Sequence, residues 1–283
     1  MSDFKEFENP WSAENSEWFG EEKDKWFEGG KYNEWFKESS EYNDKINQKY
    51  RDAIKKGLIV YTCNCGWIDR THAFMESNRP NISADKLWKQ IKNETGTKSN
   101  SPNESGFLVI YRQDATVTSF LPPIGVTRKY FVEYGLDVEV KEKIALSILQ
   151  EVSIAFEELQ SYGSLIGRGD SSFEPADLVS NLLGFYSVIR PSLSESKIFE
   201  LAKRFSTKDS LNLFDQYPDT FTNIKYKNKK FTPIFFPNKK CSNPIFPLEF
   251  QEIEPQKKGD NYRDWSELWD IYAGKPPKKG LTW

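Results

Sequence analysis

The pattern of apolar and polar positions predicts one long amphipathic helix near the middle of the chain. Between residues 140 and 162, apolar side chains recur every three or four positions, which is the repeat of one helix face. The repeat runs through Ile144, Ile148, Val152, Ala155 and Leu159. Weaker helical patterns with start or stop residues predict further helices over residues 46–56, 65–78, 85–92, 175–189, 195–205 and 208–216.

Short runs of β-branched and aromatic residues predict strands at residues 58–62, 106–112, 115–121 and 128–134. The second and third runs flank Gln113-Asp114, so we expect them to form a hairpin. Helices outnumber strands, and the strands cluster in sequence. We therefore expect an α+β fold that is mainly helical with a small antiparallel sheet.

The two ends of the chain differ in composition from the middle. Residues 1–45 repeat Trp-Phe pairs among largely acidic residues, which is not the Lys/Arg-rich pattern of a membrane-surface helix. This segment is either a set of short helices whose rings dock on the core or a docking or delivery arm for a partner protein. Residues 221–283 are rich in Pro, Asn and Lys and predict an irregular extension packed on a core of residues 46–220.

Charge and composition exclude several classes of protein. The chain has 39 Lys and Arg against 42 Asp and Glu, which argues against nucleic acid as its main partner. No apolar run reaches the roughly 18 residues that a membrane-spanning helix needs. The first residues contain no apolar signal segment, so we expect synthesis in the cytoplasm, with a specialised secretion route as the means of any delivery outside.

Three cysteines and one histidine limit the chemistry further. Cys63, Cys65 and Cys241 do not make a disulfide framework, and a reducing site of synthesis is expected. Because His72 is the sole histidine, two-histidine zinc sites and HExxH metalloproteases are excluded. Any Ser-His-Asp or Cys-His mechanism must use His72.

The first candidate site follows the first predicted strand. If residues 65–78 are helical, Cys65, Asp69 and His72 share one helix face. Asp69 would then fix the tautomer of His72 and raise its basicity. The alternative is a core cysteine beside a surface Asp-His pair.

The second candidate lies on the long predicted helix. Glu151 and Glu158 are seven residues apart and fall on the apolar stripe, whereas Glu157 is expected to point to solvent. A carboxylate on an apolar stripe is costly unless it is paired or functional, and burial suits a glutamate to general acid catalysis. The alternative is a structural ion pair with a neighbouring Arg or Lys.

The third candidate begins the helix predicted at residues 175–189. Ser171 or Ser172 is expected to cap this helix, and Asp177 complements its dipole. Ser180 and Asn181 are polar among core positions, so they are candidates for hydrogen bonds to Glu158 or His72. Capping alone would explain most of this motif.

Together the three segments resemble an uncharacterised bacterial domain family over residues 58–190. The resemblance is carried by Gly66-Trp67-Ile68-Asp69 with His72, by the glutamates before Gln160-Ser161, and by Ser171-Ser172-Phe173 through Asp177 to Ser180-Asn181-Leu182. It implies that the three segments form one site, and it implies no activity.

We expect a hydrolase whose cleft contains Asp69, His72, Glu151 and Glu158, supported by Cys65, Asp177, Ser180 and Asn181. Paired carboxylates suit glycoside cleavage, and aromatics suit sugar rings. The substrate would be a polymeric glycan such as bacterial peptidoglycan, and the protein a delivered effector or toxin. No cofactor is required.

Three alternatives stay open. Cys65 at a helix N-terminus would be the thiolate of an amidase or peptidase. Asp69, His72 and a glutamate would form a mononuclear metal site. The third alternative is a non-enzymatic binding or structural module with an aromatic docking arm.

Overall fold

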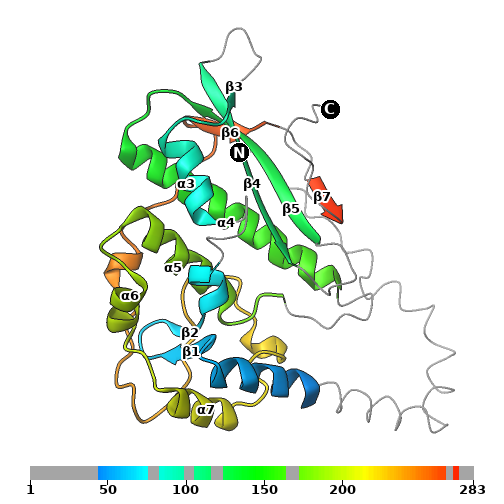
Figure 1. Cartoon of the computed structure of the whole chain (residues 1–283), viewed down its shortest axis with the longest axis vertical. Coiled ribbons are helices and arrows are strands. Elements are labelled where there is room, and N and C mark those ends of the chain that lie inside the picture. Colours follow the sequence, from blue (N-terminus) through cyan, green and yellow to red (C-terminus); the bar gives the residue numbers. More distant parts are fainter. Residues whose placement is uncertain are drawn as a thin grey trace, which may run out of the picture. The chain divides into compact units, whose positions relative to one another are not determined.

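The computed structural model describes residues 44–75, 83–98, 105–115, 124–163, 172–265 and 270–273. The chain divides into two units after Gln48, and nearly all described residues belong to the second. Most of the N-terminal segment at residues 1–45 lies outside the described residues. The described part has the expected α+β fold, with helices and two antiparallel sheets (Figure 1).

The larger sheet is built around two long strands. Its members are β3 (Thr97–Lys98), β4 (Gly106–Ala115), β5 (Ile124–Glu133), β6 (Tyr262–Asp264) and β7 (Asp270–Ala273). β4 and β5 pair antiparallel along their whole length, and β6 and β7 pair with different parts of β5. Two strands from late in the chain therefore complete a sheet that begins near its middle.

The hairpin expected around Gln113-Asp114 is wrong. β4 continues through both residues to Ala115, and residues 116–121 of the expected strand lie outside the described residues. Both side chains are buried, and the Gln113 amide donates to the Ser153 hydroxyl at 2.9 Å. Ser153 thus gives the Gln113 side chain a hydrogen-bond partner inside the sheet, although the sequence pattern alone indicates a turn at this position.

Apart from the helix expected at residues 65–78, the predicted helices are present with shifted ends. They are an N-terminal helix over residues 44–55, α3 (Ala84–Lys92), α4 (Val138–Gly163), α5 (Asp177–Ile189), α6 (Glu195–Ala202) and α7 (Thr207–Gln216). The predicted long helix is α4, which packs on β4 and β5 and contacts α3 and α5 (Figure 1). Ser194 and Ser206 begin α6 and α7 by accepting backbone N–H groups of those helices.

A second hairpin replaces the helix expected at residues 65–78. β1 (Ile59–Thr62) and β2 (Gly66–Asp69) pair antiparallel, and a short helical turn, η2 (Thr71–Met75), follows. Gly66 has a φ of +64°, and a Cβ there would lie 2.5 Å from the Ile234 carbonyl oxygen. Glycine tolerates both the left-handed conformation and the close approach of the Ile234 backbone. At Gly66 the chain therefore reverses and continues as strand β2 and not as a helix.

A long irregular segment covers the β1–β2 hairpin. The Phe236 backbone N–H donates to the Tyr61 hydroxyl at 2.9 Å, and Cys63 forms a disulfide with Cys241, 178 residues away. The three cysteines indicated no disulfide framework and a reducing site of synthesis, so a bond between two of them was not foreseen. The sequence does not indicate this pair, because the number of cysteines is odd and the two partners lie far apart in the chain. Whether two cysteines pair depends on their distance in the fold and not on their spacing in sequence.

None of the described helices combines the length and apolar character needed to cross a membrane.

Candidate functional site

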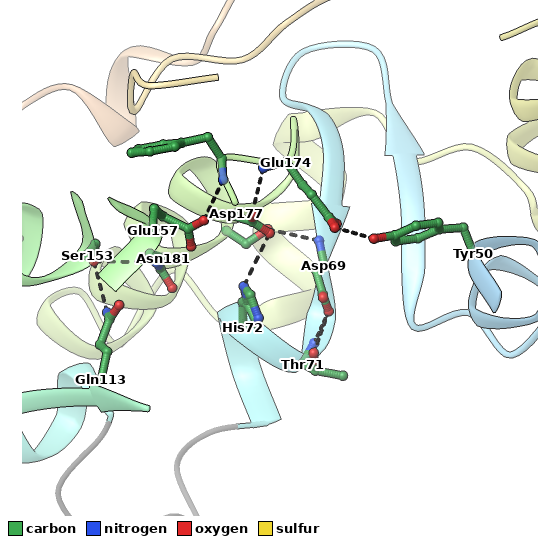
Figure 2. A network of polar contacts seen from close by, with 12 residues as sticks. Tyr50, Asp69, Thr71, His72, Gln113, Ser153, Glu157, Glu174, Asp177 and Asn181 are labelled. Carbon is green, nitrogen blue, oxygen red and sulfur yellow. Dashed lines mark hydrogen bonds and ion pairs between the residues drawn. The ribbon is translucent and has the colours of Figure 1, made fainter. Parts of the chain in front are cut away.

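Three carboxyl groups lie buried beside one another where α4 approaches the start of α5 (Figure 2). Glu157 belongs to α4, Glu174 to the turn before α5, and Asp177 to the first position of α5. Their residues are only 1%, 8% and 4% exposed. Buried acidic groups are rare without compensating partners, so this cluster is the most unusual chemical feature of the described residues.

Backbone N–H groups hold two of these carboxylates in place. The Phe173 N–H donates to Glu157 Oε2 at 2.5 Å, and the Glu174 N–H donates to Asp177 Oδ2 at 2.7 Å. Phe173 has a φ of +50°, which turns the chain sharply enough to present successive N–H groups to different acids. The Tyr50 hydroxyl donates to Glu174 Oε1 from the N-terminal helix (Figure 2).

This arrangement differs from the expected start of α5. The helix begins at Asp177, and Ala176 occupies the N-cap position without a side-chain bond. Ser172 lies earlier in the turn, where its carbonyl oxygen accepts from the Lys227 ammonium at 2.5 Å, and Ser171 lies outside the described residues. The expected serine cap is therefore wrong for Ser172, and the backbone of the turn serves to position acids.

Burial raises the pKa of all three carboxyl groups. The pKa of Glu174 rises to about 7, chiefly through burial, although the hydrogen bond from Tyr50 opposes the shift. Burial also raises the pKa of Glu157, and the pKa of Asp177 is raised by burial and then by the charges of Glu157 and Glu174. Because three like charges lie so close together, the cluster binds protons at a higher pH than isolated carboxyl groups do.

His72 of η2 lies beside the Asp177 carboxyl group of this cluster. Its Nδ1 is 3.6 Å from Asp177 Oδ1, longer than a hydrogen bond and close enough for an ion pair (Figure 2). Nδ1 is buried, whereas 32% of the side chain is exposed. The imidazole therefore presents one nitrogen to a buried carboxylate and its other edge outwards.

His72 also lines a pocket of about 270 Å³. Tyr111 of β4 and Asn181 of α5 line the same pocket, as does Ser83 at the start of α3. Such a volume is at the lower end of small-molecule sites and admits one compact group. The single histidine thus joins a buried acid cluster to a solvent-accessible cavity.

Asp69 does not orient His72, contrary to expectation. The Asp69 carboxylate accepts from the Thr71 N–H at 2.7 Å and from the Thr71 hydroxyl at 2.6 Å (Figure 2). Asp69 ends β2 and Thr71 begins η2, so the shared helix face on which the expectation rested does not exist. Asp69 instead fixes the turn that carries His72, and Asp177 takes the position beside the ring.

The two neighbouring glutamates of α4 have exchanged their expected places. Glu157 is buried in the cluster, and Glu158 is exposed. The buried face after the middle of α4 runs through Leu149, Val152, Ser153, Phe156 and Glu157. The middle of α4 is buried nearly all round. Its apolar residues therefore fit more than one helix face, and the sequence pattern does not decide which glutamate is buried.

Glu151 belongs to a different group of charges. Arg128 Nη2 lies 2.8 Å from Glu151 Oε1, and the Lys258 ammonium lies 2.8 Å from the same carboxylate. Both cations also contact Asp264 of β6. This is the structural ion pair that stood as the alternative for Glu151, and Glu151 does not line the His72 pocket.

The remaining predicted residues lie in different surroundings. Ser180 accepts the Asp69 backbone N–H at 2.8 Å, and Asn181 donates to the Ser153 hydroxyl at 3.4 Å while lining the pocket. Cys65 is fully buried and does not line the pocket, and burial raises the pKa of its thiol. A raised thiol pKa and lack of access both argue against a nucleophilic role.

Among the described residues, no group of three or more His, Cys, Asp or Glu side chains is arranged to hold a metal ion. The metal alternative built from Asp69, His72 and a glutamate therefore has no support in this part of the chain.

The sequence pattern did not indicate two members of the site, Glu157 and Glu174. Glu157 has a signal, since it lies four residues after Ser153 and eight after Leu149 on the buried face. Glu174 has none of this kind, because it lies in an irregular turn whose conformation depends on tertiary contacts. One of these is the Asn228 backbone N–H, which donates to the Phe173 carbonyl oxygen at 2.7 Å.

Comparison with known proteins finds no matching family model, no matching curated protein and no matching solved structure. The chemistry of the site is therefore the basis for a functional proposal.

Proposed function

We propose that the protein is a hydrolase in which His72 is the general base and Asp177 orients it. The observation that carries this proposal is the position of His72, which lines a pocket while its buried Nδ1 lies 3.6 Å from a buried carboxylate. Histidines that move protons in hydrolases have this arrangement on many unrelated folds.

The buried acids behind His72 suit it to this task. When Nε2 takes a proton from an attacking hydroxyl or water, the ring becomes positively charged. Asp177 lies 3.6 Å from Nδ1, and its ionised form stabilises that positive charge. The ionised form of Glu157 adds to the effect, because its charge interacts with that of His72. The carboxyl cluster thus replaces the solvent that would otherwise stabilise an imidazolium.

The pocket volume of about 270 Å³ is small, so only a small part of a polymeric substrate can enter it. Its acidic lining residues are engaged, Asp85 with Lys89 at 2.8 Å and Glu195 with Arg70 at 2.7 Å. Peptidoglycan contains both glycosidic and amide bonds, and we propose it as the polymer to assay first. This choice follows from the expected glycan substrate and leaves the bond to be determined.

The test is hydrolysis by the full chain of peptidoglycan and of chromogenic esters, amides and glycosides. His72→Ala should lower the rate by about 10²–10⁴-fold, the usual effect of losing a positioned base. Glu158→Gln is the matched control, because it removes an exposed carboxylate one residue from Glu157 and should leave the rate unchanged. An unchanged rate in folded His72→Ala, or no hydrolysis of any substrate by the wild type, would overturn the proposal.

A further inference from the structure

Ser83 has a buried hydroxyl beside the same pocket. The residue is 5% exposed and lies at the N-cap of α3, and it lines the pocket with His72. Within the described part of the chain its Oγ has no hydrogen-bond partner. Buried hydroxyls nearly always have one, so this oxygen is unusual.

The backbone at Ser83 makes the missing bond more significant. Its φ of −84° and ψ of 149° are those of a normal N-cap, from which a serine hydroxyl usually accepts a helix N–H. Ser206 does so in α7, accepting from the Asp209 N–H at 3.1 Å. Ser83 has the same opportunity and does not use it, so both the donor and the acceptor capacity of its hydroxyl are unused within the described residues.

We propose that Ser83 is the nucleophile of a Ser83–His72–Asp177 triad, and that the substrate is an acyl compound, an ester or an amide. This inference rests on the proposed function, because His72 must act as the base. The three residues come from the start of α3, from η2 and from α5. Such triads are recognised by geometry and roles, and their order along the chain varies freely.

The chemistry takes place in two balanced steps. Ser83 Oγ attacks the substrate carbonyl carbon and passes its proton to His72 Nε2, which returns that proton to the departing alcohol or amine. Water then attacks the acyl-serine, again giving a proton to His72, and the proton goes back to Ser83 Oγ as the carboxylic acid leaves. The acyl group is bonded to Ser83 between the steps, so the enzyme passes through a covalent intermediate.

The start of α3 also offers stabilisation of the developing oxyanion. The first N–H groups of a helix have no acceptor within the helix and carry its positive dipole end. Ala84 and Asp85 supply these groups and line the pocket. The Asp85 carboxylate binds Lys89, which balances the one negative side chain at this end of the helix.

Labelling of the full chain with a fluorophosphonate probe tests the proposal, with the adduct located by peptide mass spectrometry. We expect one adduct, on Ser83, and no adduct on Ser83→Ala, which should lose at least about 10³-fold in ester or amide hydrolysis. Ser206→Ala is the matched control, because it removes the N-cap hydroxyl of another helix and should keep full labelling. An adduct on another residue would overturn the inference.

A second variant covers the case in which Ser83→Ala does not fold. Ser83→Cys keeps the shape of the side chain, and should lose fluorophosphonate labelling while gaining iodoacetamide labelling at position 83. The wild-type chain gives little background, since Cys63 and Cys241 are joined and Cys65 is buried. Iodoacetamide-resistant Ser83→Cys would contradict the inference.

The two proposals fail in different ways. Hydrolysis that requires His72 but is unchanged in Ser83→Ala would overturn the nucleophile and leave His72 as the base for direct attack by water. Hydrolysis that requires neither residue would overturn both proposals.

Discussion

Gly184 of α5 lies directly against Ala73, the residue that follows His72. A Cβ at position 184 would be 2.5 Å from the Ala73 carbonyl oxygen, a distance that real side chains do not adopt. The missing side chain allows η2 to approach α5, and α5 also carries Asp177. The spacing between His72 and Asp177 therefore depends on the close approach that Gly184 allows.

Gly184→Ala should move His72 away from Asp177. Overpacking of a close backbone contact costs about 1–3 kcal/mol, so chemical denaturation should show a lower free energy of unfolding. The rate of hydrolysis should also fall, because the imidazole no longer meets its carboxylate. Gly135→Ala is the control: its φ is +75° with open space around it, so alanine there should lower stability and leave the rate unchanged.

Asp177→Asn should impair the site while nearly preserving its shape. The asparagine oxygen can still accept the Glu174 N–H, which leaves the amide NH₂ facing His72 Nδ1. The ring would then be held in the wrong tautomer, and loss of about 10⁴-fold in kcat is the known scale for this exchange in a triad. Equal kcat in the variant and the wild type, with both folded, would show that Asp177 does not orient the base.

Stability should fall as pH rises through the acidic and neutral range. The pKa of Glu174 is raised from 4.5 to about 7, so the folded state binds more protons than the unfolded state between these values. The stabilising contribution is complete below about pH 4.5 and is lost as pH rises towards 7, by about 1.4 kcal/mol per unit of pKa shift. The raised pKa values of Glu157 and Asp177 act in the same direction.

Urea denaturation of the wild type and Glu174→Gln at several pH values measures this effect. The glutamine can still accept the Tyr50 hydroxyl, and it removes one titrating group from the cluster. Its free energy of unfolding should therefore fall less steeply over the same range. Parallel pH profiles for the two proteins would contradict the raised pKa of Glu174.

Reduction of the disulfide should destabilise the protein. Cys63 and Cys241 close a loop of 178 residues, for which chain entropy gives a stabilisation of about 3–5 kcal/mol. Dithiothreitol should lower the Tm of the wild type and have no effect on a Cys63→Ser, Cys241→Ser double variant. A Tm that is insensitive to reductant would show that the bond contributes nothing to stability in solution.

The helices were predictable because their signal is local. The repeat around Ile144 and Ile148 indicates α4, and the start and stop residues of α6 and α7 lie within a few positions of their ends. The strands at β4 and β5 were predictable as strands but not in their extent. The polar pair Gln113-Asp114 between two apolar runs indicates a turn, whereas the bond of Gln113 to Ser153 on another element accounts for its place in β4.

The candidate site was predictable in part. His72 and Asp177 could be singled out by residue type, but their pairing depends on the packing of η2 on α5, which no spacing in the sequence encodes. The β1–β2 hairpin was missed because the residues after Cys65 fit a helical repeat, whereas the conformation of Gly66 ends that possibility. Tertiary contacts decided each of these cases.

The sheet topology has a consequence for the protein during its synthesis. β5 pairs with β4 on one edge, and its other edge is covered by β6 and β7, which emerge from the ribosome more than a hundred residues later. Until then the nascent chain carries a long strand with an open edge, a surface prone to wrong pairing and aggregation. Chaperone demand during translation should therefore be greatest in the interval between these strands.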